Sequence, residues 1–207
     1  MAKFPEPPPA PDLARLPPVL HVLPPGTHCW RIYFQGGPHP SAWNASRDYG
    51  PTTARFDHHL SPPHLQSRGT LYVAESAGTC FAEVFQETRV IDRVRNDPWL
   101  VCLELVAPVT LLDLRGQWPT QAGASMAINS GPRPRAQRWS RAVYSAYAIV
   151  EGLHYSSSMD GNRPAIVLYE RAAKALPAAP SFHRALADPT LTAATARAAE
   201  RLRYVVV

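Results

Sequence analysis

The stretch RGTLYVAESAGTCFAEVFQET, residues 68–88, joins two different periodicities across a break of small residues. The apolar run near its start predicts a short buried strand over residues 70–74. The apolar side chains after the break recur at helical spacing and predict a helix over about residues 78–87; they are Phe81, Val84 and Phe85. We therefore expect a strand that turns directly into a helix packed against the core.

Glu83 lies in the middle of this predicted helix, roughly opposite the apolar stripe on a helical wheel. Two interpretations stay open from the residues alone. Glu83 is either a solvated charge on the outer face of the helix or a carboxylate that lines a cleft on the side away from the core. Periodicity gives the direction of the side chain but not what it faces.

The length and composition of the chain favour one globular domain. Its 207 residues are 45% hydrophobic and 18% charged, which allows one sizeable core rather than two full domains. No apolar run reaches the roughly 18 residues that a membrane span needs, and the N-terminus lacks the pattern of a signal peptide. The sequence therefore predicts a cytoplasmic protein with no membrane association. Three widely spaced cysteines, Cys29, Cys80 and Cys102, are expected to pack as small hydrophobes.

The N-terminal segment is unusually rich in proline. Nine of the 23 prolines fall within the first 25 residues, a density that disfavours a regular helix or a central strand. We interpret residues 1–25 as an arm that is either strapped over the body or partly disordered, and residues 26–207 as the folded domain.

Helix and strand patterns alternate irregularly along the rest of the chain, which predicts a single α+β domain. A long loop over residues 36–68 is rich in Gly, Pro, Ser and His, and loops of this length are often functional. A second irregular stretch covers residues 116–133, and the final RYVVV is expected to be a buried strand. The other predicted strands lie at 29–34, 99–106, 109–114, 151–158 and 164–170, and the last two are expected to pair around a polar turn. Further helices lie at 134–150 and after Asp188.

Several kinds of site are disfavoured by the motifs. The chain has no glycine-rich dinucleotide fingerprint, no P-loop and no nucleophile elbow. His58, His59 and His64 cluster in the long loop without the spacing of a metal site, so we expect a solvated or ligand-fringing loop and no bound metal. A formal net charge of +5, carried mostly by arginine, suits either a phosphate-bearing small ligand or a basic nucleic-acid-binding module.

Two arginines and a tyrosine are the remaining candidates. Arg31 lies within the apolar strand CWRIYF, where it either reaches the surface or points into a cleft that holds an anion. Arg55 closes the long loop, and Tyr72 on the next strand offers an aromatic face and a hydroxyl.

These pieces occur in an order that resembles the RES domain family. The first half of the resemblance is carried by WRIY (30–33), ARF (54–56), LYVAES (71–76) and AGTCFAEVF (77–85). The second half is carried by WLVCLELVAPVTLLDLRG (99–116), QRWSRAVYSAYAIVEGLHYSS (137–157) and PAIVLYER (164–171). The resemblance places the family's arginine at Arg31, its glutamate at Glu83 and its serine at Ser157, although three consecutive serines leave Ser156 and Ser158 open as neighbouring registers.

The resemblance implies a specific chemistry. RES domains have an ADP-ribosyltransferase-like fold and are toxins of toxin–antitoxin pairs that act on NAD by phosphorolysis, hydrolysis or ADP-ribosyl transfer. It implies Glu83 and Arg31 as catalytic residues and four residues that bind NAD: Arg55, Tyr72, Ser157 and Tyr33. NAD would be a substrate, with inorganic phosphate as a candidate co-substrate and no further cofactor.

The resemblance also implies a partner, an Xre-type helix-turn-helix antitoxin. A toxin–antitoxin hetero-oligomer or a homo-oligomer is therefore expected, with no direct contact to nucleic acid.

Overall fold

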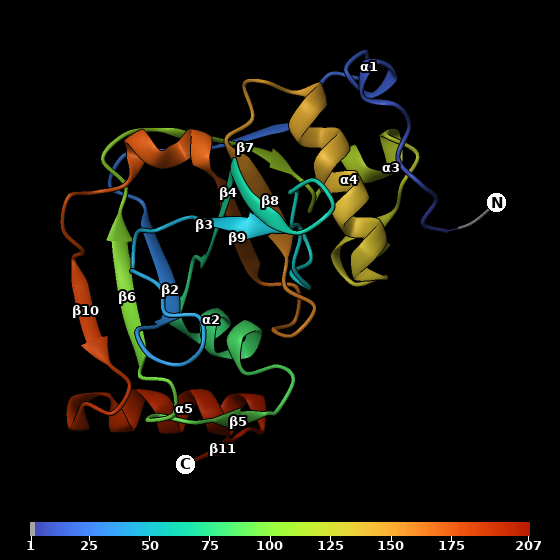
Figure 1. Cartoon of the computed structure of the whole chain (residues 1–207). Coiled ribbons are helices and arrows are strands. Elements are labelled where there is room, and N and C mark those ends of the chain that lie inside the picture. The colour runs from blue at the N-terminus through green and yellow to red at the C-terminus, as the bar shows by residue number, and fades with distance from the viewer. Residues whose placement is uncertain (1–2) are drawn as a thin grey trace.

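Nine strands assemble into one mixed sheet (Figure 1). In this computed structural model, which describes residues 3–207, the order is β1-β7-β8-β9-β4-β2-β6-β10, with β3 paired to β4. Within the sheet β7 and β8 run parallel, and the other pairs are antiparallel. Its strands are β1 (Leu20–Leu23), β2 (His28–Phe34), β3 (Arg47–Gly50), β4 (His64–Ala74), β6 (Pro98–Glu104), β7 (Val109–Asp113), β8 (Gly152–Ser156), β9 (Pro164–Tyr169) and β10 (Phe182–Ala185).

The helices pack on two separate parts of this sheet (Figure 1). Trp139 and Val143 of α4 pack with Val167 in one apolar cluster, because these helix residues recur on a single face. Helices α2 and α5 form a second cluster at the other end of the sheet, next to a small parallel pair of strands. The helices are α1 (Ala10–Leu13), α2 (Ala77–Val84), α3 (Trp118–Gln121), α4 (Arg133–Ala146) and α5 (Thr192–Leu202); the small pair is β5 (Val90–Ile91) and β11 (Val205–Val206).

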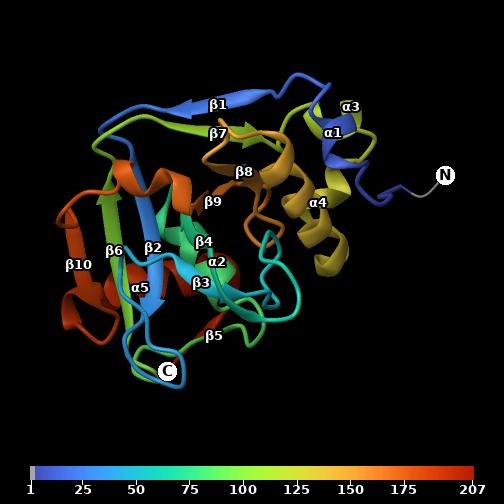
Figure 2. The same cartoon turned by 45° about the horizontal axis from the view of Figure 1, so that its top comes forward.

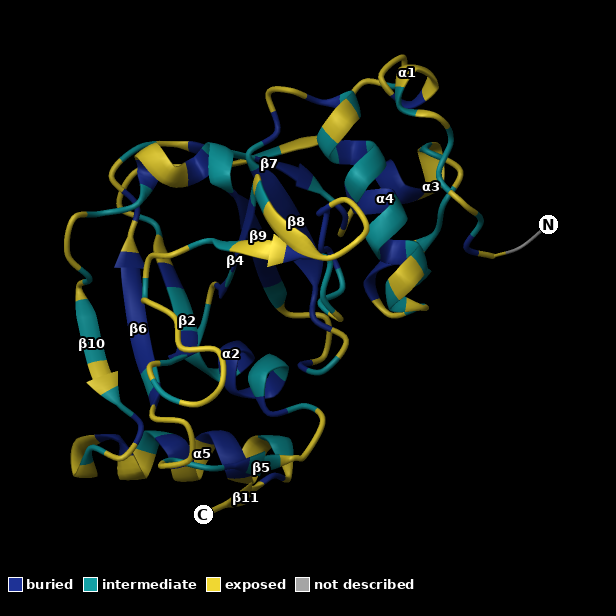
Figure 3. Cartoon of the chain, in the orientation of Figure 1, coloured by how far each residue is buried: buried dark blue, intermediate teal, exposed yellow. Residues whose placement is uncertain are grey.

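Burial follows the strand pattern. Figure 3 shows β6 and the central strands in the colour of buried residues, whereas the outer faces of α5 and the loops are exposed. Cys29, Cys80 and Cys102 are all free and buried, as the sequence predicts. The predicted α+β class with a mixed sheet flanked by helices is therefore confirmed.

The proline-rich arm packs on the body. Figure 2 shows β1 lying along β7 at the edge of the sheet, where four residue pairs join the two strands. β1 lies between Pro18 and Pro24 and contains no proline, so its amides are free to pair. The expectation of no regular helix is wrong for a single turn, α1, because Pro11 occupies an early helical position where no amide is needed. Met1 and Ala2 lie outside the described residues.

The long loop between β2 and β4 is more ordered than its composition predicts. It contains β3, and β4 already begins at His64. His58 and His59 are fully buried rather than solvated. Both histidines are buried because they have partners in the fold: His59 Nδ1 donates to Asp57 Oδ1 at 2.5 Å, and the ring of His58 stacks on Tyr144 with 4.3 Å between centroids. Only His64 of the three is exposed.

The observed secondary structure also differs from the predictions in several smaller ways. The last predicted turn of α4 is absent, because the backbone becomes extended at Tyr147 and leaves Ile149 62% exposed. The irregular stretch 116–133 contains α3 and the 3₁₀ turn η1 (Met126–Asn129), and two more 3₁₀ turns are η2 (Glu170–Ala175) and η3 (Pro189–Leu191). The C-terminal valines are exposed rather than buried, because β11 pairs only with the two-residue β5 at the surface. No helix among residues 3–207 has the length and apolarity to cross a membrane.

Candidate active site

The sheet divides where β2 meets β4. β2 pairs with β6 over seven residues, yet it pairs with β4 at one position alone, Trp30 opposite Ala74. Beyond that point the two strands diverge, and a cavity of about 410 Å³ lies between them. We call it the split cavity. Its lining includes charged and aromatic side chains from β2, the loop before β4, β4, α2, α4 and β8: Arg31, Arg55, Tyr72, Glu83, Arg133 and Tyr155.

Arg31 extends from β2 into the split cavity. Its Nη1 donates to the carbonyl of Ala45 at 3.2 Å. Burial lowers the pKa of Arg31 to about 10, partly opposed by Tyr33, so the guanidinium stays charged at neutral pH. Arg31 has no carboxylate partner within residues 3–207, which leaves its charge available to an anionic ligand.

Glu83 is presented by α2, which begins where the Ser76 side chain accepts a hydrogen bond from the Thr79 amide at 3.1 Å. Phe81 and Phe85 pack into the core, and the carboxylate of Glu83 points the other way, into the lining of the split cavity. The structure therefore brings Glu83 to a cleft, the second of the two interpretations that the sequence leaves open.

The Glu83 carboxylate has one close donor. Ser157 Oγ donates to Glu83 Oε1 at 2.5 Å and accepts from the Met159 amide at 3.2 Å. Burial raises the pKa of Glu83, and the Ser157 hydrogen bond and the charges of Arg55 and Arg133 offset this only in part. The result is a desolvated carboxylate that interacts strongly with any positive charge placed beside it.

The three consecutive serines have different surroundings. Ser157 is buried and contacts Glu83, whereas Ser158 is exposed and lies at the mouth of the cavity. The amide of Ser156 donates to Asn129 Oδ1 at 3.3 Å. Of the three registers, the geometry brings Ser157 to the glutamate.

Arg55 and Tyr72 also line the split cavity. Arg55 Nη1 donates to the carbonyl of Gly131 at 2.6 Å, and burial, followed by the neighbouring charge of Arg133, lowers the pKa of Arg55. The hydroxyl of Tyr72 accepts from the Phe56 amide at 3.0 Å. Tyr72 thus uses its hydroxyl to hold the loop that carries Arg55, and its ring contributes to the cavity wall.

Two predicted site residues are not part of the lining of the split cavity: Ser157, which contacts Glu83 from behind, and Tyr33. Tyr33 is 2% exposed and packs in the apolar cluster on the sheet with Val101. Its hydroxyl is hydrogen-bonded to His183 Nε2 at 2.6 Å and accepts from Gln35 Nε2 at 2.8 Å. The ring centroid lies 5.8 Å from Cζ of Arg31. Tyr33 therefore packs beside Arg31 and supports its guanidinium, and it does not line the cavity that would hold a ligand.

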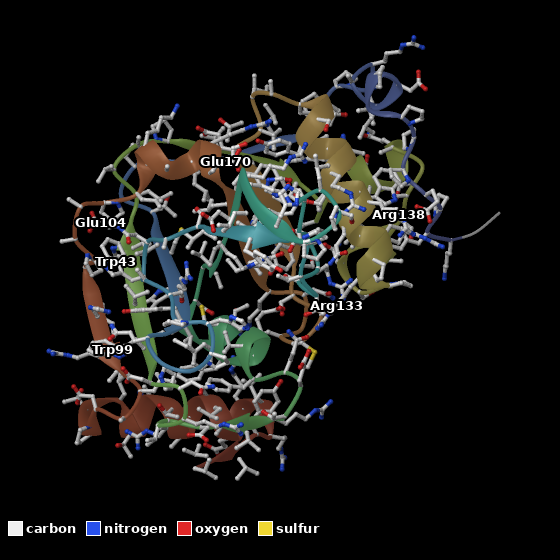
Figure 4. All side chains as sticks on the ribbon, in the orientation of Figure 1. Trp43, Trp99, Glu104, Arg133, Arg138 and Glu170 are labelled. Carbon is white, nitrogen blue, oxygen red and sulfur yellow. The ribbon has the colours of Figure 1, made fainter. Side chains whose placement is uncertain are left out.

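Arg133 and Tyr155 are lining residues that the sequence analysis missed. Arg133, at the end of α4 nearest α2 (Figure 4), donates from Nη2 to Gln86 at 3.2 Å and pairs with Glu87 at 3.3 Å. An arginine in the first turn opposes the helix dipole, so its position is a signal of function that sequence reasoning could have used. Tyr155 of β8 left no signal, because buried aromatic residues in strands are common.

One group of side chains has the composition of a metal site. Donor atoms of His21, Glu75 and His154 lie within 4.8 Å of one another. The rings of His21 and His154 stack with 4.3 Å between centroids, and Arg115 Nη1 lies 3.4 Å from His154 Nε2. A guanidinium this close disfavours a second cation. The group instead attaches β1 of the arm to the sheet.

Comparisons with known proteins agree with this architecture. The family model of the RES domain matches residues 28–196. A chain in the crystal structure of the M. tuberculosis MbcT–MbcA toxin–antitoxin complex superposes with a TM-score of 0.52 at 18% identity, and the match covers 79% of this chain and 85% of that one. No curated protein sequence matches the chain. The family match spans β2 to α5 and includes every side chain that lines the split cavity, so this protein belongs to the RES domain family.

Proposed function

We propose that this protein is an enzyme that consumes NAD by cleaving the bond between nicotinamide and ribose. The observation that carries the proposal is the desolvated carboxylate of Glu83, which shares one cavity with Arg31 and Arg55. Cleavage of an N-glycosidic bond passes through an oxocarbenium-like ribose, as glycoside hydrolysis does. A carboxylate in a low-dielectric site stabilises such a cation more strongly than water does.

Each side chain has a role in this reaction. Glu83 faces the ribose and stabilises the positive charge that develops at C1′, while the Ser157 hydroxyl holds the carboxylate in place. Arg31 and Arg55 bind the pyrophosphate through their paired N–H groups. Tyr72 and Tyr155 form an aromatic wall for the nicotinamide ring. Nicotinamide leaves as a neutral base with the electron pair of the broken bond, so no strong general acid is needed.

Arg133 favours inorganic phosphate as the acceptor. It lies close enough to Arg55 to lower the pKa of that residue, so two cations face the same part of the cavity as Glu83. Glu87, the ion-pair partner of Arg133, is 76% exposed, and exposed pairs are weak enough to exchange for a phosphate. A phosphate oxygen then forms the bond to C1′ as the C1′–N bond breaks. Water or a protein nucleophile in the same place would give hydrolysis or ADP-ribosyl transfer.

We further propose that the protein is the toxin of a toxin–antitoxin pair and acts in the cytoplasm. The family membership and the fold shared with a chain of a toxin–antitoxin complex support an antitoxin partner. We expect this partner to be of the Xre helix-turn-helix class.

The test is product analysis of NAD by mass spectrometry. Purified protein, free of antitoxin, is incubated with NAD in the presence and absence of phosphate. We expect free nicotinamide and a phosphate-dependent ADP-ribose-1″-phosphate. Free ADP-ribose in both conditions would assign hydrolysis, and a modified protein would assign transfer. Intact NAD after long incubation with folded protein would overturn the proposal. Glu104→Gln, an exposed glutamate at the far side of the sheet (Figure 4), is the control expected to retain full activity.

A further inference from the structure

A second cavity adjoins the split cavity. It has a volume of about 630 Å³, and the two share Asn129 and Ser158 in their linings. We call it the arm cavity, because Lys3 of the proline-rich arm forms part of its rim. Most of the side chains in its lining are polar or basic, among them Lys3, Arg115, Ser125, Asn129, Ser158 and Asn162, and Met126 and Ala127 add an apolar part.

The arm side of this cavity is anchored. Phe4 is 5% exposed, and its ring lies against Gly131, where an added Cβ would come within 3.0 Å of it. Trp139 Nε1 donates to the carbonyl of Pro5 at 2.9 Å, and Glu6 pairs with Arg138 at 2.5 Å. Figure 4 shows Arg138 on the side of α4 that faces the arm. The residues directly after Lys3 are thus held in place, and Lys3 is delivered to the rim of the cavity.

The opposite side is formed by the end of β7. The amide of Arg115 donates to Asp113 Oδ1 at 2.8 Å, which turns the chain as the strand ends. Asn129 links this end to β8, because its Nδ2 donates to the Leu114 carbonyl at 3.1 Å and its Oδ1 accepts from the Ser156 amide. Asn129 is buried. It therefore forms a fixed partition between the two cavities.

The charge of the arm cavity is unbalanced. Its lining includes Lys3 and Arg115 but no aspartate or glutamate. Neither cation forms an ion pair within residues 3–207. Hydroxyl and amide groups of Ser125, Ser158 and Asn162 lie in the same wall. Two cations among neutral hydrogen-bonding groups fit a phosphorylated sugar better than a neutral nucleoside.

We propose that the arm cavity holds the adenosine end of the dinucleotide, and that Lys3 and Arg115 select a substrate with a third phosphate on that ribose. The inference rests on the proposed function, in which Arg31 and Arg55 bind the pyrophosphate in the split cavity. NAD carries only those two phosphates, so its adenosine leaves Lys3 and Arg115 without an anion. NADP supplies one, and it is the preferred substrate.

The first test compares kcat/KM for NADP and NAD. We expect wild-type protein to favour NADP by about tenfold, the value of one charge-assisted hydrogen bond. Lys3→Ala and Arg115→Ala each lower kcat/KM for NADP by about tenfold, so the ratio of the NADP value to the NAD value falls toward 1. Lys174→Ala and Arg95→Ala remove the same charges from exposed positions outside both cavities, and leave both substrates unaffected. Equal use of both substrates, or a ratio that survives in the Lys3 and Arg115 variants, would overturn the inference.

A second test is independent of turnover. Adenosine 2′,5′-bisphosphate and 5′-AMP, which lack nicotinamide, are titrated by calorimetry into the Glu83→Gln protein. We expect the bisphosphate to bind about tenfold more tightly, and this preference to disappear in Glu83→Gln proteins that also carry Lys3→Ala or Arg115→Ala. Tighter binding without cleavage of either dinucleotide would keep the subsite and reject the proposed reaction. Cleavage of NAD without any preference for the bisphosphate would do the reverse.

Discussion

Asp57 and Glu83 are two desolvated carboxylates with opposite surroundings. Asp57 Oδ2 accepts from Arg47 Nη1 at 3.0 Å and from the Thr52 amide at 2.7 Å, and its Oδ1 accepts from His59 Nδ1 at 2.5 Å. Glu83 has the single Ser157 donor. Burial acts to raise both pKa values. The hydrogen bonds from His59 and Thr52, with the charge of Arg47, outweigh it at Asp57 and lower that pKa, whereas the pKa of Glu83 stays raised.

The number of hydrogen-bond donors distinguishes a carboxylate with a structural role from one that is available for chemistry. A fully hydrogen-bonded carboxylate has no capacity left to stabilise a new cation, and it holds its surroundings together. A carboxylate with one donor and an open cavity keeps that capacity at a cost in stability. Asp57 thereby anchors the loop that carries Arg55, and in the proposed reaction Glu83 acts on the ligand that Arg55 binds.

The largest expected effect is on cleavage in Glu83→Gln. The amide keeps the shape of the side chain but loses the charge that stabilises the ribose cation, so kcat for NAD falls by about 10³-fold or more. The free energy of unfolding does not fall, because a poorly solvated charge has been removed. Nicotinamide release and urea denaturation measure the two quantities. A variant that loses stability but keeps its activity would reverse the roles assigned to the two carboxylates.

Asp57→Asn is expected to do the opposite. The change leaves Arg47 without its ion-pair partner and weakens the His59 contact, which lowers the free energy of unfolding by about 3 kcal/mol. Urea denaturation checks this value. Near 10 °C, where the folded variant still predominates, kcat falls far less than in Glu83→Gln. A stability change below about 0.5 kcal/mol, typical of an exposed site, would contradict the structural role.

Arg31→Ala and Tyr33→Phe distinguish a residue of β2 that binds the ligand from a neighbouring residue that only holds the Arg31 guanidinium in place. Loss of the guanidinium removes a charge-assisted contact to the pyrophosphate and lowers kcat/KM for NAD by about 100-fold. Tyr33→Phe keeps the ring beneath Arg31 and changes kcat/KM by less than about threefold, with a stability loss of about 1 kcal/mol for the hydroxyl bound to His183. Steady-state kinetics of both variants provide the measurement. An equal loss in both would return Tyr33 to the binding site.

The smallest expected effect is the pH dependence of stability, where the two carboxylates have opposite signs. A lowered pKa means that folded Asp57 binds fewer protons than the unfolded chain, so its stabilisation is present above the usual Asp pKa and is lost as pH falls below it. Above pH 4.5, folded Glu83 binds more protons than Glu83 of the unfolded chain. The contribution of Glu83 to the free energy of unfolding therefore falls as the pH rises from about 4.5.

Unfolding measured from pH 4 to 7 isolates the Glu83 contribution. We expect wild-type protein to lose stability relative to Glu83→Gln as the pH rises over this range. The acid limb of kcat/KM for NAD should likewise lie above pH 4.5 in wild-type protein, because only the ionised carboxylate stabilises the ribose cation. A stability difference that stays constant with pH would show that Glu83 is solvated like a surface residue.

Local periodicity predicts much of the fold. The stretch from β4 to α2 follows directly from its two patterns, and the off-core direction of Glu83 follows from the helical wheel. The antiparallel β8–β9 pair also follows, because two apolar runs flank a polar turn. Each of these features depends on residues that are close in sequence.

The candidate site is less predictable. His58 and His59 look solvated beside prolines, and their burial depends on Tyr144 and Asp57. Arg133 lies 47 positions from its partner Gln86. No sequence pattern predicts such contacts between distant residues, because hydropathy describes each segment separately.

The sequence by itself determined the strand that turns into α2, the long helix α4, several of the central strands and the direction of Glu83 away from the apolar stripe. Only the tertiary structure decided that β2 and β4 diverge after Trp30 and Ala74, and that Ser157 reaches Glu83 from 74 positions away. The physical reason is that periodicity records which face of a segment avoids water. Whether Glu83 faces solvent or a cavity depends on where two strands stop pairing, and that is settled by the packing of the whole sheet.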